Sequence, residues 1–330
     1  FQDEFILGFE KALGNRWTAG VKYIHRDLKS VMDDICEGDL AEAWALENGY
    51  SADEAASIGG TVGNCFLYNP GKDLVANVDL AGDGTLTAVR IPASALKMPK
   101  PKRTYDALEF ELERQWDKKW SFRGSYVLAF SKGNTEGYVK SDIGQDDAGI
   151  SQDFDHPGLM EGSNGYLPND RRHTVKLFGS YAVTDELRLG GSLIAQSGRP
   201  KNCFGVYAGD LPDASASYGG ASFYCNGVLA KRGSQGRLPW MYDVNLQLNY
   251  TPSAVKGLSF TVDALNILNK RTVRAITEIG EEAIGSPEAN YQQPILNSIQ
   301  PPRRFRAGLT RYPLTSAPSE SPHPTGSLRR

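Results

Sequence analysis

The amino-acid sequence predicts an all-β fold, an antiparallel transmembrane β-barrel. Apolar and polar residues alternate at every second position in several segments, which gives each strand two chemically different faces. These segments reach about 14 residues, whereas strands of soluble proteins usually have about five or six. Short turns and long loops also alternate along the chain, as they do in membrane barrels whose turns all lie on one side of the membrane.

The clearest of these signals is the hairpin 103–132. Its first arm alternates Leu108 and Phe110 with Glu109 and Glu111, and only two residues separate it from an arm of the same kind. The same criterion predicts nine strands, at 1–13, 16–29, 103–116, 119–132, 171–183, 186–199, 238–251, 258–268 and 303–312. The long loop 30–102 is expected to be irregular, apart from a small hairpin within 73–91.

The two faces of these strands predict which residues meet lipid and which line the lumen. The residues expected to face lipid are Phe110, Leu112, Tyr126, Leu128, Leu246 and Leu248. The candidates for a wet, ligand-binding lumen are Glu109, Glu111, Arg123, Asp243, Asn245 and Gln247. An aromatic girdle beside the short turns is predicted from Trp17, Trp116, Trp120, Tyr181 and Tyr250.

Composition limits the partners and the class of membrane protein. The formal net charge is −3, and no cluster of Lys and Arg is interleaved with aromatic residues, so nucleic acid is not an expected partner. No apolar run approaches the roughly 18 residues of a spanning helix. The chain begins inside a predicted strand without a signal-peptide pattern, which suggests that it starts within a larger protein.

Four cysteines fall in two pairs, each inside one long loop. In an oxidising compartment this placement predicts the disulfides Cys36–Cys65 and Cys203–Cys225. A metal site is the less favoured alternative, because it would require closer spacing such as C-x-x-C.

Two acidic segments are weak candidates for cation binding. Asp79 and Asp83 lie in N-V-D-L-A-G-D-G, but the spacing misses the EF-hand pattern, so a solvated turn is favoured and no metal is expected. The loop residues Asp142, Asp146, Asp147, Asp153 and Asp155 are candidates to gather cations, with a plain soluble loop as the favoured reading.

No catalytic site is predicted. The four histidines are scattered, and the chain has no serine elbow, no H-E-x-x-H motif and no glycine-rich phosphate loop. The carboxylates of Glu109 and Glu111 lack a partner base, so they fit a wet lumen better than a reaction. The chain is therefore interpreted as a protein that is not an enzyme and needs no cofactor.

Four segments resemble the C-terminal part of TonB-dependent outer-membrane receptors of the Oar-like kind. They are Q-D-E-F-I-L-G-F-E at 2–10, D-I-G-Q-D-D-A-G-I-S-Q-D-F-D-H-P at 142–157, Y-L-P-N-D-R-R-H-T-V-K-L-F-G-S-Y at 166–181 and V-D-A-L-N-I-L-N-K-R at 262–271. The resemblance implies a Gram-negative outer-membrane location, a 22-stranded barrel of which residues 1–312 would supply the last nine strands, and coupling to TonB through a plug domain. The plug has no counterpart here, so the chain alone is not expected to transport.

The resemblance ends with the last strand. The family finishes on an aromatic residue, whereas residues 313–330 form a Ser/Pro-rich tail that is expected to be disordered. The favoured function is the C-terminal barrel portion of a receptor that imports an unidentified ligand. The alternatives are an outer-membrane adhesin or structural barrel without energy coupling, and a secreted soluble β-protein.

Overall fold

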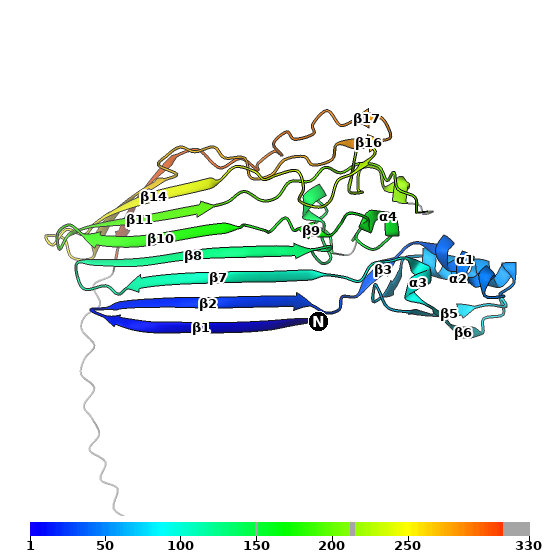
Figure 1. The fold of residues 1–330 in the computed structure, drawn as a ribbon. Coiled ribbons are helices and arrows are strands. Elements are labelled where there is room, and N and C mark those ends of the chain that lie inside the picture. The colour runs from blue at the N-terminus through cyan, green and yellow to red at the C-terminus, as the bar shows by residue number, and fades with distance from the viewer. Residues whose placement is uncertain (149–150, 212–214, 313–330) are drawn as a thin grey trace, which may run out of the picture.

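A computed structural model of the chain describes residues 1–148, 151–211 and 215–312. The predicted tail, 313–330, lies outside the described residues. The main sheet contains nine long strands in a meander, each antiparallel to the strand before it in the chain (Figure 1). These strands are β1 (Gln2–Gly14), β2 (Trp17–Leu28), β7 (Arg103–Arg114), β8 (Trp120–Gly133), β10 (His173–Ala182), β11 (Leu187–Gln196), β14 (Met241–Tyr250), β15 (Leu258–Leu265) and β18 (Arg304–Arg311).

The predicted fold class is confirmed, and all nine predicted strands are present in the predicted order. The bounds differ most, by three residues, at the end of β11, the start of β14 and the end of β15, which stops at Leu265 rather than at residue 268. Asn266 has φ of 47°, in the left-handed region, and its side chain donates hydrogen bonds to the carbonyl oxygens of Lys270 and Pro301. The backbone therefore leaves the ladder at a residue type that tolerates this conformation.

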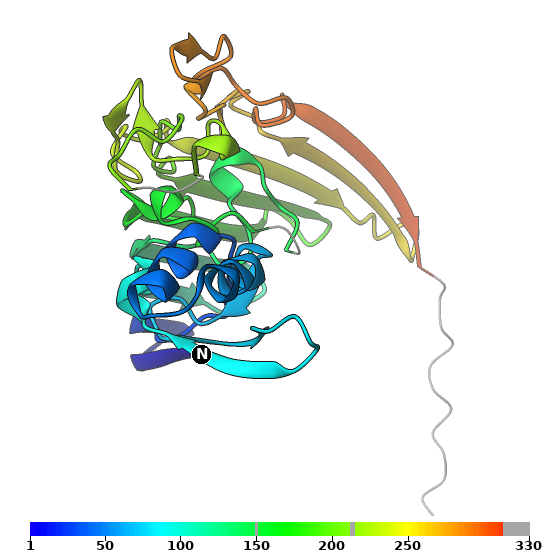
Figure 2. The same ribbon diagram turned by 90° about the vertical axis from the view of Figure 1, so that its right-hand side faces the viewer.

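Short turns and long loops separate to opposite ends of the sheet. Figure 1 shows the turns of the four hairpins at one end and the long connections, with all the labelled helices, at the other. Viewed from the loop end, the sheet is a curved wall (Figure 2). Among the described residues, β1 pairs only with β2 and β18 only with β15, so both are edge strands of this sheet.

The register places the predicted apolar and polar residues on opposite faces. Directly paired residues share a face, and one such row crosses six strands through Val21, Phe110, Tyr126, Val175, Ala195 and Tyr242. We call this the apolar face. The adjacent row runs through Lys22, Glu109, Val127, Thr174 and Gln196 on the other side, which we call the polar face.

Loop 1 (residues 29–102) is not the irregular segment that the sequence predicted. It contains the helices α1 (Gly38–Glu47), α2 (Ala52–Gly63) and α3 (Ala93–Leu96), with the small pairs β3 (Asp33–Ile35) and β4 (Phe66–Tyr68), and β5 (Leu74–Asp79) and β6 (Leu86–Ile91). The last pair is the predicted small hairpin. A Cβ on Gly38 would lie 2.4 Å from the carbonyl oxygen of Gly59, so glycine is required where α1 meets α2.

The other long loops carry short elements. Loop 2 (134–172) has η1 (Ser141–Ile143), α4 (Pro157–Met160) and β9 (Gly165–Tyr166), which pairs with the end of β8. Loop 3 (197–240) has η2 (Ser215–Tyr218), β12 (Tyr224–Cys225) and β13 (Val228–Leu229), and loop 4 (266–303) has β16 (Glu281–Ala283) and β17 (Ser286–Pro287). None of the helices in the described ranges is long and apolar enough to cross a membrane.

The larger hydrophobic core lies mostly in loop 1, and Phe154 and Met160 of loop 2 complete it. Its buried residues include Ile35, Ile58, Leu74 and Leu96, and all four are fully buried. The corresponding cluster on the sheet contains only Ile24, Ala107 and Ala129, which lie side by side on β2, β7 and β8. The sheet therefore has almost no apolar interior of its own.

Candidate functional site

The six predicted lumen residues lie on the polar face, in two groups. Glu109 and Glu111 line a pocket of about 230 Å³ with Lys22, whose Nζ lies 2.7 Å from Glu109 Oε2. Arg123 lies on the neighbouring strand, opposite Glu113. The strand order places β10 and β11 between this group and the residues on β14.

The second group lies on β14 beside loop 4. Asp243 and Asn245 line a pocket of about 150 Å³, and Asn245 Oδ1 accepts a hydrogen bond from the backbone of Asn266. Gln247 donates to Asp263, which also binds Arg306 at 2.7 Å. Several of these side chains are therefore paired within the polar face, although Asp243 Oδ1 is buried without a hydrogen-bond partner. The assignment of these residues to ligand binding stays a prediction.

At the loop end of the sheet, loops 1 to 4 contact one another and form one layer, which we call the loop layer. Its centre is Arg232 of loop 3, whose side chain is completely buried. The guanidinium lies 3.1 Å from Asp142 Oδ2 and donates from Nε to the carbonyl oxygen of Ser163 at 2.7 Å. Glu136 and Asp153 lie farther away, at 3.9 Å each. Loop 3 is thus fixed to loop 2 by a buried cation.

Lys140 is a second buried cation at the same junction. Its Nζ donates to the carbonyl oxygen of Ala221 at 2.9 Å, lies 3.7 Å from Asp153 and is 5.4 Å from the ring centres of Phe204 and Phe223. Burial lowers the pKa of Lys140 and raises the pKa of Asp142, since low-dielectric surroundings disfavour both charged forms.

Loop 4 joins the layer through Glu278. This carboxylate lies 2.8 Å from Arg199 Nη2 and also accepts hydrogen bonds from the backbone and side chain of Asn202. Burial raises the pKa of Glu278 to about 7, and the Arg199 charge opposes that rise. Arg237 and Asp170 form a further ion pair between loops 3 and 2.

Loop 1 contacts loop 2 through buried polar groups. His156 Nδ1 is 2.8 Å from Glu37 Oε2, and the backbone N–H of Cys36 donates to the carbonyl oxygen of Asp155 at 2.9 Å. The Asp155 carboxylate accepts a hydrogen bond from the Tyr218 hydroxyl at 2.9 Å. Burial raises the pKa of Asp155 to about 7, and the Tyr218 hydrogen bond opposes the rise.

The acidic segment 142–155 of loop 2 is therefore not fully exposed to solvent. Asp142, Asp153 and Asp155 are buried against loops 1 and 3, while Asp146 and Asp147 are exposed. The partners Lys140, Arg199 and Arg232 were missed at the sequence level. Lys140 belongs to loop 2 itself and lies near Asp153, whereas Arg232 reaches Asp142 from loop 3 and Arg199 pairs with Glu278 of loop 4. The last two pairs join loops far apart in sequence, so no local pattern marks them.

Both predicted disulfides are formed. Cys36 pairs with Cys65 inside loop 1, and Cys203 pairs with Cys225 inside loop 3. Each bridge joins two parts of one loop, as the cysteine positions predicted.

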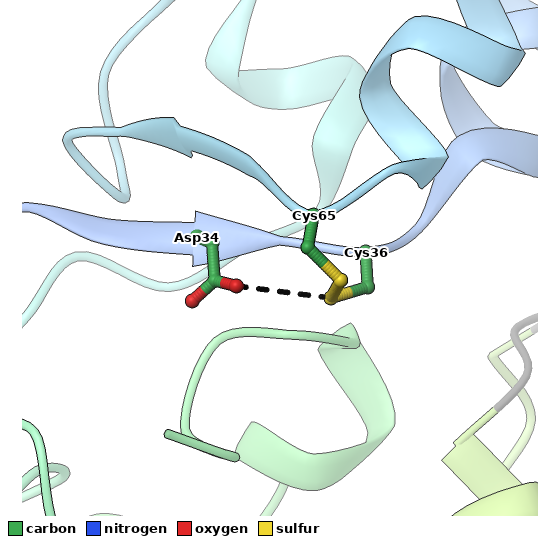
Figure 3. A group of neighbouring side chains, drawn as sticks. All are labelled: Asp34, Cys36 and Cys65. Atoms are coloured by element: carbon green, nitrogen blue, oxygen red, sulfur yellow. Dashed lines mark hydrogen bonds between the residues drawn. A yellow bond between two sulfur atoms is a disulfide. The ribbon is translucent and has the colours of Figure 1, made fainter. Parts of the chain in front are cut away.

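Asp34, Cys36 and Cys65 are the single group of three potential metal-ligating residues among the residues that the structure describes (Figure 3). The two sulfur atoms are joined in a disulfide, and Asp34 Oδ2 lies 4.0 Å from Cys36 Sγ. A disulfide offers no thiolate, so this group does not make a metal site while the bridge is formed.

The carboxylates of Asp79 and Asp83 accept hydrogen bonds from the backbone of the β5–β6 turn. Asp79 accepts hydrogen bonds from the backbone N–H groups of Asp83 and Gly84, and Asp83 accepts one from Thr85. These bonds lower the pKa of Asp83 and account for both acids without a cation.

Comparison with characterised proteins bears on the family. The chain is 28% identical over 282 residues to the TonB-dependent transporter Oar of Myxococcus xanthus, covering 84% of the chain and 22% of that protein. The predicted resemblance is confirmed. The chain spans about a fifth of the length of this relative. No model of a known protein family matches the chain.

Solved structures that match the chain include a siderophore receptor and an outer membrane transporter. The siderophore receptor PiuA from Acinetobacter baumannii matches 94% of the chain with 28% of its own, at 12% identity and a TM-score of 0.46. The outer membrane transporter YddB from Escherichia coli matches 94% of the chain with 32% of its own, at 12% identity and a TM-score of 0.45.

Proposed function

We propose that this chain forms part of the barrel wall of a TonB-dependent receptor that takes up an extracellular ligand. The observation that supports it most is the pairing of a two-faced meander with a structured loop layer at one end. The 28% identity to a TonB-dependent transporter supports the same class. The sheet alone has two edges, so in this proposal β1 and β18 pair with further strands of a larger barrel, of which residues 1–312 supply the C-terminal portion.

In this proposal the loop layer faces outside and is the first surface that the ligand meets. Its helices, ion pairs and disulfides give it a defined shape, which a selective receptor needs in order to bind with little loss of conformational entropy. A ligand that passes the loop layer would then meet the charged and amide side chains of the polar face. In this proposal, coupling to TonB is a property of the whole receptor and runs through its plug domain.

Epitope insertion tests the orientation. A short tag placed in the β5–β6 turn of loop 1 (residues 80–84) is expected to bind antibody on intact cells. The same tag between β10 and β11, at 184–185, is expected to bind only after the outer membrane is permeabilised. The reverse pattern would reject the proposed topology.

The alternative function, an adhesin or structural barrel without energy coupling, uses the same strands and loops. Loop 1 supports it, because a segment with a disulfide and most of a hydrophobic core resembles a displayed module. The two functions differ in the need for TonB. Capture of the full-length protein by an immobilised TonB periplasmic domain supports the receptor, and failure of capture with a folded barrel supports the adhesin.

A further inference from the structure

A cavity of about 360 Å³ lies where loops 1, 2 and 3 meet, and its charged residues are all basic. Lys100 and Lys102 come from the end of loop 1 and Lys231 comes from loop 3, while Asn134, Ser163 and Asn164 of loop 2 complete its polar lining. No carboxylate lines the cavity.

The three ammonium groups have no counterion in the described part of the chain. None of the ion pairs or side-chain hydrogen bonds there involves Nζ of Lys100, Lys102 or Lys231, although Lys22, Lys29 and Lys140 each have a carboxylate within 4 Å. Three like charges around one cavity repel one another, so an anion bound between them would lower the electrostatic energy.

The backbone around the cavity is held in place. Pro99 and Pro101 flank Lys100 and restrict its backbone. The buried Asn134 accepts a hydrogen bond from the N–H of Lys102 at 2.7 Å and donates one to the carbonyl oxygen of Lys100 at 3.1 Å. On the other side, Arg232 fixes its neighbour Lys231 by donating to the carbonyl oxygen of Ser163. The lysines therefore extend from a rigid frame.

The cavity lies beyond the loop end of the apolar face. Phe130 pairs with Asp106 and Lys132 with Thr104 on that face, and the N–H of Asn134 continues the ladder by donating to the carbonyl oxygen of Lys102. Asn134 follows Phe130 by four positions, about 13 Å along an extended strand. The lysines thus lie beyond the last apolar residue of that row, on the side where lipid headgroups lie if that face meets hydrocarbon.

We propose that Lys100, Lys102 and Lys231 form a binding site for the phosphoryl groups of a membrane lipid. Basic pockets beside the apolar belt of a membrane protein bind anionic headgroups, and several lysines contribute together. The inference rests on the membrane placement in the proposed function, but not on ligand uptake or on TonB. The acyl chains of the bound lipid would lie along the apolar face, on the side of the cavity that faces the strands.

The test uses the protein purified in neutral detergent and mixed micelles that carry phosphatidic acid, with diacylglycerol of the same chains as the uncharged lipid. We expect the variant K100Q/K102Q/K231Q to bind phosphatidic acid about 100-fold more weakly than the unchanged protein. The variant K72Q/K256Q/K270Q, which removes three exposed lysines outside the cavity, should bind normally. The variant K100R/K102R/K231R keeps the charges and should retain binding.

Three outcomes would overturn the proposal. They are normal binding by K100Q/K102Q/K231Q, equal binding of diacylglycerol, and displacement of the lipid by an equal concentration of inorganic phosphate. Heat-modifiable migration of each variant shows that the barrel has folded. If one of these outcomes is found and the epitope tags still show the expected orientation, the lipid site is rejected and the proposed receptor function is unaffected.

Discussion

The main sheet and loop 1 are stabilised in different ways. Loop 1 has a core of fully buried apolar side chains, as a small water-soluble domain has. The sheet has three buried apolar residues in its own cluster, and its apolar face stays exposed, with Phe110 at 43% and Leu246 at 47%. In the proposed barrel, lipid provides the apolar surroundings of the sheet, whereas buried side chains provide those of loop 1. The two regions should therefore respond to different mutations.

The largest expected effect is in the loop layer, on replacing Arg232 with alanine. The change leaves Asp142 buried without its closest cation, and breaking a buried ion pair in this way costs about 3–5 kcal/mol. Loops 2 and 3 should become sensitive to protease while the sheet stays folded. Arg90→Ala is the control, since its ion pair with Asp73 is exposed and is expected to contribute little to stability. Equal protease resistance in both variants would contradict a stabilising role for Arg232.

The apolar face should be next in sensitivity. Leu246→Arg puts a charge on that face, which costs about 2–4 kcal/mol at mid-membrane. Gln247→Arg puts the same charge on the polar face, beside Asp263, and should be tolerated. The measurement is the fraction of protein in outer membranes that shows heat-modifiable migration. Equal loss in the two variants would mean that the faces are assigned wrongly.

The loop 1 disulfide should contribute about 3 kcal/mol, by the chain-entropy model for a loop of this size. The variant C36S/C65S should therefore weaken loop 1 without affecting the sheet. Hydrogen exchange of the α1 and α2 amides, compared with those of β7 and β8, measures both regions in one sample. If the strands lost protection together with the helices, the two regions would not be independent.

The smallest expected effect is at the N-cap of α2. Ser51 accepts a hydrogen bond from the N–H of Glu54, and the Glu54 carboxylate accepts one from the N–H of Ser51. Ser51→Ala should cost about 1 kcal/mol in loop 1. Ala56→Ser, at an exposed position inside the same helix, should cost only a few tenths of a kcal/mol. Protection of the α2 amides in hydrogen exchange ranks the two variants, and an equal loss would contradict the cap.

The sequence was sufficient for the sheet because its signals are local. The alternation of Leu108, Phe110 and Leu112 with glutamates depends only on neighbours in the chain, and the meander then follows from the turns. The helix α2 was also readable, since S-A-D-E at 51–54 is a capping box, yet the loop was interpreted as irregular.

The loop layer could not be predicted in the same way. Asp142 and Arg232 are 90 residues apart, and nothing in either neighbourhood indicates that they meet. Their contact depends on how two loops are placed by strands that neither loop contains. The same holds for Lys102 and Lys231, whose shared cavity appears only once loops 1, 2 and 3 lie together.

The meander also determines how such a wall can be built. Within each hairpin the two long strands pair across a short turn, so this pairing needs only a short-range search. Neighbouring hairpins pair across the long loops, so these contacts join segments that are distant in the chain. An extra hairpin inserted by gene duplication would widen the wall while leaving every existing pairing but one unchanged. The same topology thus makes circumference a property that evolution can change one hairpin at a time.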